Sequence, residues 1–314
     1  MVRVGTVAVD STKLAANAST DANRTHDQLR EEAARILGEA ADIDAAEDAR
    51  FGERRGDELP AELADAIGRP ARIRELLERA RRGAQEIEAE RAQMHERRRQ
   101  ERAATGRAPT GRPPGARPTV QQRHKLANTK YNLTDPDSAV VHHRGTLLQG
   151  YNVHSAVADG QIILAMRATG IAPDQGQLAP TLQHAQANLA RVGITDVIGE
   201  VLADSGYWNS AQIGALQRRG TRVLVPPMDR KARSTQTMQP ETRRMREILA
   251  TEEGQRAYRR RQQIAEPVFA HIKHHRAITR LLRRGRAAVQ AEIDLIATTH
   301  NLLKLWRHST APAG

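Results

Sequence analysis

A series of short apolar runs constrains the fold of this chain most strongly. Each run is rich in β-branched residues and is bounded by polar or turn-forming residues, which predicts buried strands. The expected strands are Val2–Val9, Leu148–Ala158, Gln161–Thr169, Val197–Ala203 and Thr221–Val225. Helical stretches follow the third, fourth and fifth of them, which predicts an α/β fold with a mixed sheet and flanking helices.

Local signals predict how these elements begin and end. The dipeptide Asp159-Gly160 joins two of the runs and favours a β-hairpin. Asp174–Arg191 is expected to be helical, with Asp174 as its N-cap. Asn209–Arg219 predicts a short helix closed by Gly220, and from about Gln239 the chain is expected to be helical.

A segment of different composition separates the first expected strand from the other expected strands. His26–Arg50 carries an apolar helical stripe, and the stripe from Ile73 to Met94 fits a helical hairpin or a short coiled coil. Thr105–Pro118 is a linker of Pro, Gly and Arg that cannot form a core. The expected segments are a first core strand in residues 1–24, an inserted helical arm with its linker in 25–122, the remainder of the core in 123–308, and a disordered tail in 309–314.

Three carboxylates recur at comparable places in this series. Asp10 follows the first expected strand, Asp204 follows the fourth, and Glu266 lies on the helix after the fifth. Open α/β sheets bind ligands beyond the ends of their strands. A single Asp there is more often a cap or turn residue, and a charged helix is more often a solvated face with ion pairs. Three agreeing placements favour a site, and the element order is that of a ribonuclease H-like fold.

Carboxylates of this kind predict a metal site. Hard oxygen ligands without a His or Cys cluster suit Mg²⁺ or Mn²⁺. Two such ions about 3.5–4 Å apart can activate an attacking oxygen and stabilise a leaving one at phosphorus. Without metal, clustered carboxylates raise each other's pKa, so we expect a loose bare site and an ordered metal-bound one.

Composition limits the class of partner. The chain has 49 Lys and Arg against 37 Asp and Glu, a net charge of +12, which favours a polyanion; the alternative is charge that serves solubility alone. Aromatic residues make up 3%, so base stacking is not expected to dominate binding. The absence of cysteine excludes disulfides and thiol catalysis. Without an 18-residue apolar run or a signal peptide, we expect a soluble, intracellular protein with no membrane partner.

Six segments together resemble the DDE transposases of bacterial insertion sequences. They are VAVDSTKLAANAS, NLTDPDS, GYNVHSAV, LADSGYW, AEPVFAHIK and THNLLKL, and they span nearly the whole chain except the arm. The branch is the one with a Tyr–Arg–Glu–Lys signature around the last acid. The resemblance implies that Asp10, Asp204 and Glu266 are the catalytic triad and bind two Mg²⁺ or Mn²⁺ ions.

The resemblance also implies DNA contacts. Tyr258, Arg261 and Lys273 would be the signature residues that touch transposon-end phosphates. The spacing from Glu266 to Lys273 fits the family pattern, whereas that from Arg261 to Glu266 is one residue longer than the usual form.

Further DNA-binding candidates lie beside these motifs. Tyr207 and Trp208 follow the second acid closely; they stack on an extruded base or, as the favoured alternative, form a packed aromatic pair. Arg283 and Arg284 belong to a basic run and are candidates for phosphate contact.

Family members usually carry a helical domain before the first catalytic strand. Here Met1 lies nine residues before Asp10, so we expect the catalytic part of a transposase whose end-recognition region is missing or separately encoded.

The resemblance implies a transposase that cuts and joins DNA at insertion-sequence ends, with water and then a 3′-hydroxyl as nucleophiles. Its partners would be double-stranded transposon ends and target DNA, bound by a homodimer that assembles on DNA, in the bacterial cytoplasm with the nucleoid. A nuclease of the same fold and a catalytically silent DNA-binding fragment are the alternatives.

Overall fold

The computed structural model divides the chain into two compact units. Unit 1 contains Met1–Thr20 and Asp137–Gly314, and unit 2 contains Asp21–Pro136. The residues that the structure describes are 5–51, 73–79, 81–82, 85, 89, 92–93, 96, 99–100, 102–103, 129–143, 145–228 and 240–310.

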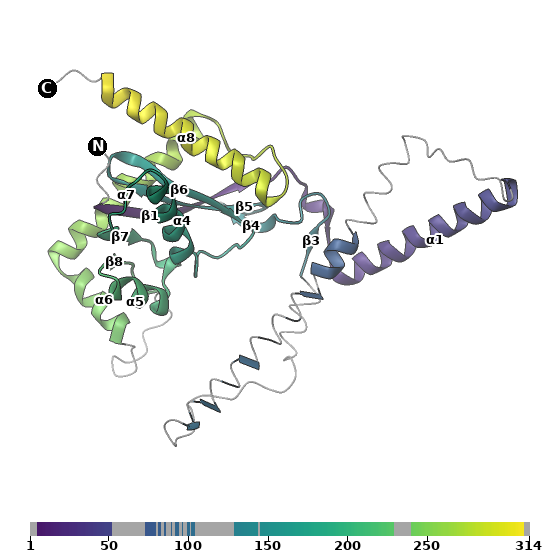
Figure 1. Cartoon of the computed structure of the whole chain (residues 1–314), viewed down its shortest axis with the longest axis horizontal. Helices are drawn as coiled ribbons and strands as arrows, with labels where there is room; N and C mark the ends of the chain where they lie inside the picture. Colours follow the sequence, from purple (N-terminus) through teal and green to yellow (C-terminus); the bar gives the residue numbers. More distant parts are fainter. Residues whose placement is uncertain are drawn as a thin grey trace. The chain divides into compact units, whose positions relative to one another are not determined.

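Unit 1 is built on a six-stranded mixed sheet (Figure 1). Its strands are β1 (Thr6–Ala15), β4 (Ala139–His143), β5 (Thr146–Ala158), β6 (Ile162–Thr169), β7 (Glu200–Ala203) and β8 (Arg222–Leu224). β1 lies between β5, which is antiparallel to it, and β7, which is parallel to it, and β8 continues the sheet parallel to β7. The other edge of β5 pairs with β4 along its first part and with β6 along its second. The mixed α/β class is confirmed, and this strand order is compatible with a ribonuclease H-like core.

Helices cover both faces of this sheet. They are α4 (Leu178–Arg191), α5 (Ser210–Arg218), α6 (Pro240–Ala250), α7 (Glu252–Ala270) and α8 (Arg286–Thr310), with the π-helical turn η6 (His271–His275) after α7. Because side chains alternate along a strand, Val7 and Val9 of β1 pack with α4, α5 and α6, whereas Ala8 and Leu14 pack with α7 and α8. The core is therefore divided into two apolar layers, one on each side of the sheet.

Helix α8 also satisfies part of the edge strand β6. Asn301 accepts a hydrogen bond from the backbone N–H of Ile163 (2.9 Å) and donates one to its carbonyl (2.8 Å). Gln290 likewise accepts from the N–H of Ala168 (3.1 Å) and donates to the carbonyl of Met166 (2.8 Å). These side-chain amides form the hydrogen bonds with the backbone of β6 that a neighbouring strand would otherwise form, which protects an otherwise open edge.

The first strand differs from its prediction. β1 extends to Ala15, so Asp10 lies inside the strand and not at its end. The apolar pattern stops at Val9, but β5 pairs with β1 without a break from Val7 to Ala15, and this pairing keeps the polar residues extended. Residues 2–4 of the expected strand lie outside the described residues.

The predicted N-cap of α4 is wrong. The helix begins at Leu178 with Gln177 at the N-cap position. Asp174 lies three residues further back, where its carbonyl accepts from the N–H of Gln177 (3.0 Å) and its carboxylate faces the sheet. The short helix predicted at Asn209–Arg219 is α5, and the Asn209 side chain caps it by accepting from the N–H of Gln212 at 3.1 Å.

The expected hairpin is confirmed, with a longer turn. β5 and β6 are joined by the 3-10 turn η3 (Asp159–Gln161). Gly160 has a φ of 77° and Gln161 one of 64°, so a residue with a side chain also occupies the left-handed region here. β7 and β8 are shorter than the apolar runs that predicted them.

Unit 2 contains the 3-10 turn η1 (Thr20–Ala22, which begins at the unit boundary), the short pair of β2 (Asn23–Arg24) with β3 (Tyr131–Asn132), and the helix α1 (His26–Phe51). Residues 73–79 are also helical. Thr25 and Gln28 form a reciprocal capping box at the start of α1, with distances of 3.0 and 3.3 Å. The linker Thr105–Pro118, part of the second apolar stripe and residues 311–314 lie outside the described residues.

None of the helices in the described part of the chain is long and apolar enough to cross a membrane.

Candidate active site

Asp10 occupies a largely buried position on the α7 side of β1. One carboxylate oxygen (Oδ2) accepts from Nη1 of Arg261 at 2.9 Å, and the other accepts from the N–H of Ser11 at 2.8 Å. The Asp10 side chain is 15% exposed and that of Arg261 is 13% exposed. Burial raises the pKa of Asp10 to about 6, although Arg261 and the Ser11 N–H oppose the rise. The carboxyl therefore titrates near neutral pH.

Asp204 lies directly after β7, the parallel neighbour of β1. The last paired residues of these strands are Val9 and Ala203, so Asp10 and Asp204 follow at corresponding places on adjacent strands. Asp204 caps the short turn η4 (Ser205–Tyr207) and accepts from the N–H of Gly206 at 2.9 Å. Burial raises its pKa, and the charge of Asp174 raises it further. The charge of Asp204 in turn adds to the rise of the pKa of Asp10, for which burial is the largest cause.

Asp174 is a functional candidate that the sequence interpretation missed. Its Oδ1 accepts from Ser11 Oγ (2.8 Å), Asn152 Nδ2 (2.7 Å) and Lys13 Nζ (3.3 Å). Burial raises the pKa of Asp174, but the Asn152 hydrogen bond and the charge of Lys13 outweigh burial, so its pKa lies below the usual value. A permanent negative charge thus stands beside Asp10 and Asp204. No local signal marks it, since its partners come from β1 and β5.

His154 and Tyr207 extend this polar network into the core. The Tyr207 hydroxyl lies 2.7 Å from His154 Nδ1, and both residues are fully buried. Burial lowers the pKa of His154 to about 3, although the charge of Asp174 opposes the shift, so the imidazole is neutral at pH 7. Asn152 and His154 thus use their side chains in this network, in addition to pairing with β1 in the sheet.

The predicted DNA contact of Tyr207 does not fit this position. Its ring has no exposed surface and packs in the core layer, and Trp208 packs partly buried against the same layer. A base cannot stack on a ring that is covered on all sides. Packing of both side chains against the core, as the favoured alternative supposed, describes this structure, with the Tyr207 ring in edge contact with His154.

The signature residues lie around Arg261 on α7 and η6. The Arg261 guanidinium carbon is 5.9 Å from the centre of the Tyr258 ring, within the range of a cation–π contact. Glu266 is exposed on α7, and its charge is among those that raise the pKa of Arg261. Lys273 Nζ donates to the backbone carbonyl of Lys13 in β1 at 2.8 Å. Arg261 and Lys273 thus both donate hydrogen bonds to β1, the strand that carries Asp10.

The two basic candidates near the end of unit 1 are exposed. Arg284 donates from Nε to the carbonyl of Asn17 at 2.8 Å, and the backbone N–H of Arg283 donates to Glu292 at 2.9 Å. The Arg283 and Arg284 side chains therefore lie at the surface, where a phosphate can approach them.

The acidic pair fits a divalent cation by its chemistry. Mg²⁺ binds one or two carboxylates and keeps waters for its other positions. Burial, and to a smaller extent the neighbouring carboxylates, raise the pKa values of Asp10 and Asp204, and a cation would offset both effects. In the described part of the chain, however, no three His, Asp or Glu side chains are grouped closely enough to hold a metal ion. The structure thus brings Asp10 and Asp204 together and leaves Glu266 outside that group.

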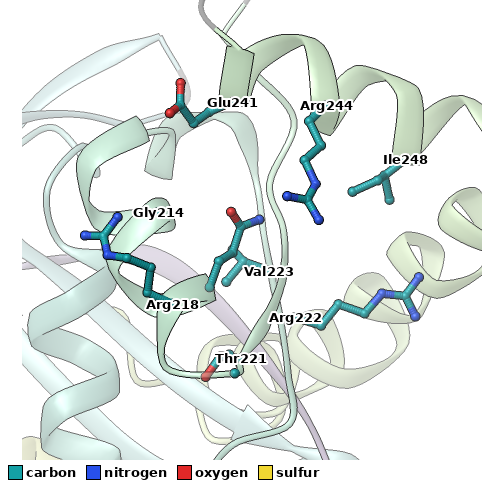
Figure 2. Close-up of a pocket in the computed structure, with 10 residues that line it drawn as sticks. Gly214, Arg218, Thr221, Arg222, Val223, Glu241, Arg244 and Ile248 are labelled. Atoms are coloured by element: carbon teal, nitrogen blue, oxygen red, sulfur yellow. The ribbon is translucent and has the colours of Figure 1, made fainter.

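A separate hollow of about 660 Å³ lies between α5, β8 and α6 (Figure 2). Arg218, Arg222 and Arg244 line it, but none of the three predicted acids does. Figure 2 shows Arg218 and Arg222 pointing to opposite sides. Arg222 is also paired with Glu200 (3.4 Å) and Glu253 (3.0 Å), so its charge is already balanced. This hollow is therefore not the site of the three predicted catalytic acids.

Comparison with known families adds a finding for the C-terminal part. Residues 216–306 match a family model described as a transposase DDE domain. The matched range contains Tyr258, Arg261, Glu266 and Lys273, and it does not contain Asp10 or Asp204. No curated protein and no solved structure matched the chain. The family match supports a DDE transposase, for which DNA is the substrate.

Proposed function

We propose that this chain is the catalytic part of an insertion-sequence transposase that cleaves DNA and joins the strands with two divalent ions. Asp10, Asp204 and Glu266 would hold the ions. The observation that carries the proposal is the pair of Asp10 and Asp204 on adjacent parallel strands, both with raised pKa values. The match of residues 216–306 to a transposase domain supports it independently.

Mg²⁺ or Mn²⁺, when bound, would supply an activated oxygen nucleophile and stabilise the leaving oxygen at phosphorus. The protein's part is to place the ligands. Arg261 holds Asp10 by a 2.9 Å ion pair, and Asp174, fixed by Asn152 and Lys13, adds negative charge that favours a cation beside it. Glu266 lies on the same helix as Arg261, five residues further on.

DNA is the proposed substrate of this site, as transposon ends and as target. The net charge of +12 supports a polyanionic partner. Tyr258, Lys273, Arg283 and Arg284 are the proposed phosphate contacts, and Arg261 would join them once a cation replaces it at Asp10. Assembly as a homodimer on DNA, in the bacterial cytoplasm, completes the proposal.

One observation favours a second candidate, a DNA-binding fragment without turnover. Within the described residues the three predicted acids do not form a group, and Arg261 already neutralises Asp10. Such a fragment would bind DNA through its cationic surface but would not cleave it.

Mn²⁺-dependent nicking and strand transfer on the element's terminal sequences test these alternatives. The informative variant is Glu266→Gln, which keeps the shape of the side chain and removes its charge. Glu252→Gln is the matched control, since Glu252 is an acid in the first turn of the same helix. We expect activity in the wild type and the control, and its loss in Glu266→Gln.

Activity in all three proteins would show that Glu266 is not the third ligand. Salt-sensitive DNA binding without cleavage in any of them would favour the silent fragment. Cleavage without joining of pre-cut ends would favour a nuclease of the same fold.

A further inference from the structure

A second cavity, of about 240 Å³, lies among η3, the C-terminal part of α7, η6 and α8. Its ionisable lining side chains are those of His271, His275, His300, Lys304 and Arg307. Among the residues that the structure describes, no acidic side chain lines it. Five basic groups therefore surround one small space on unit 1.

Two of these groups, His271 and His300, form a hydrogen-bonded histidine pair. His300 is 2% exposed, and its Nε2 lies 3.0 Å from the carbonyl oxygen of Gln161. A carbonyl only accepts, so Nε2 carries the proton and Nδ1 of neutral His300 is an acceptor. His271 Nδ1, 3.1 Å from it, is then the donor. Burial lowers the pKa of both rings, which favours their neutral forms, and for neutral rings the hydrogen bonds assign both tautomers.

Within the described residues, no acid balances the cations beside the pair. Lys304 donates to the side-chain oxygen of Gln161, a neutral group. In the described part of the chain no Asp or Glu forms an ion pair with Lys304, Arg307 or His275. Burial lowers the pKa of Lys304, and the charge of Arg307 lowers it further. Burial lowers the pKa of His271, and the charge of Arg276, which lies next to the pair, lowers it further. Uncompensated positive charge is costly, and a bound anion would remove that cost.

Gln161 is held at the cavity in an unusual backbone conformation. Its φ is 64°, in the left-handed region that costs a non-glycine residue energy. The carbonyl of Gln161 binds His300 and its amide side chain binds Lys304, so the same residue orients two of the basic groups. The cavity wall is thus constructed by specific contacts.

We propose that this cavity binds an oxyanion of the phosphate type. A water molecule occupies about 30 Å³, so the space holds roughly eight waters, and it is smaller than the roughly 300–1,000 Å³ of pockets for larger ligands. This size fits one phosphate group with some water, and not a whole nucleotide. The anion is either free phosphate or a phosphodiester of DNA. The cavity contains none of Asp10, Asp204 or Glu266, so this site does not depend on the proposed catalytic function.

Titration of ¹⁵N-histidine-labelled protein with inorganic phosphate, followed by NMR of the imidazole nitrogens, tests the site. We expect saturable shifts of the His271 and His300 signals. Lys304→Gln and Arg307→Gln should each weaken binding by roughly tenfold, because each removes one charge-assisted hydrogen-bond donor. Arg286→Gln is the matched control, since it removes the same charge from α8 outside the cavity, and it should leave the affinity unchanged.

Sulfate, which does not titrate near neutral pH, isolates the response of the protein. An anion raises the pKa values of the imidazoles, so sulfate should bind more tightly as the pH falls from 8 to 6. The groups that face the pair are His275, Lys304, Arg307 and Arg276, and all of them favour the anion. A short DNA duplex that displaces phosphate would identify the phosphodiester as the source, and a duplex that leaves the phosphate signals unchanged would identify the free ion.

Absence of saturable shifts at millimolar phosphate would overturn the proposal. Equal affinity in the wild type, Lys304→Gln and Arg307→Gln would overturn it as well, because binding would then not involve the cavity.

Discussion

Replacing Arg261 with Gln would remove the guanidinium that lies 2.9 Å from Asp10 Oδ2. Two unit charges about 4 Å apart attract by about 4 kcal/mol at an effective dielectric constant of 20, which corresponds to a change of about 3 in pKa. Water reaches both side chains to some extent, since they are 13% and 15% exposed. We therefore expect the pKa of Asp10, about 6 in the wild type, to rise by about 1–3 in Arg261→Gln.

This change alters the state of the carboxyl at neutral pH. With a pKa of about 6, Asp10 is about nine-tenths ionised at pH 7, whereas in the variant it would be at most about half ionised. Carbon-detected NMR of the Asp side-chain carboxyls over pH 4 to 9 measures the pKa directly. Arg260→Gln is a matched control, because the neighbouring Arg260 pairs with Asp159 and not with Asp10.

A pKa of Asp10 that is the same in Arg261→Gln and in the wild type would refute the reasoning. It would mean that solvent, and not the guanidinium, determines the charge of this carboxyl. An equal rise in both variants would attribute the effect to the general charge of α7.

Three further outcomes follow from the same structure. Burial raises the pKa of Asp10 from 3.8 to about 6, so its favourable contribution to folding is complete below pH 3.8 and is lost as the pH rises through 6. In urea unfolding, the free energy of unfolding of Asp10→Asn should therefore rise by about 3 kcal/mol relative to that of the wild type between pH 4 and 7. A difference between the two proteins that does not change with pH would contradict this. Tyr207→Phe removes the hydroxyl that His154 bonds, and it should lower the free energy of unfolding by about 1–3 kcal/mol; an unchanged stability would contradict this. Gly254→Ala places a Cβ 2.0 Å from the carbonyl oxygen of Ile248. Thermal unfolding should show a loss of stability of about 1–3 kcal/mol or more. An unchanged stability would mean that α6 and α7 can separate easily.

Local pattern was enough to predict most of the core. The apolar runs gave the hairpin of β5 and β6 and the two short parallel strands, because buried strands need apolar residues on both faces. The local pattern did not predict the full length of β1, because there strand pairing and not side-chain polarity keeps the chain extended. Asp10 to Lys13 have no apolar character, and β5 holds them in β1 by backbone hydrogen bonds.

The sequence by itself determined the class of the fold and the position of Asp204 directly after its strand, since both depend on short-range periodicity. The place of Asp10 inside β1 depended on the pairing with β5. Only the tertiary structure decided what these acids contact. The partner of Asp10 is Arg261, 251 residues away, and Ser11 is 163 residues from Asp174. Charges act through space, so burial and the neighbours that the fold supplies determine each pKa, and no spacing along the chain encodes them.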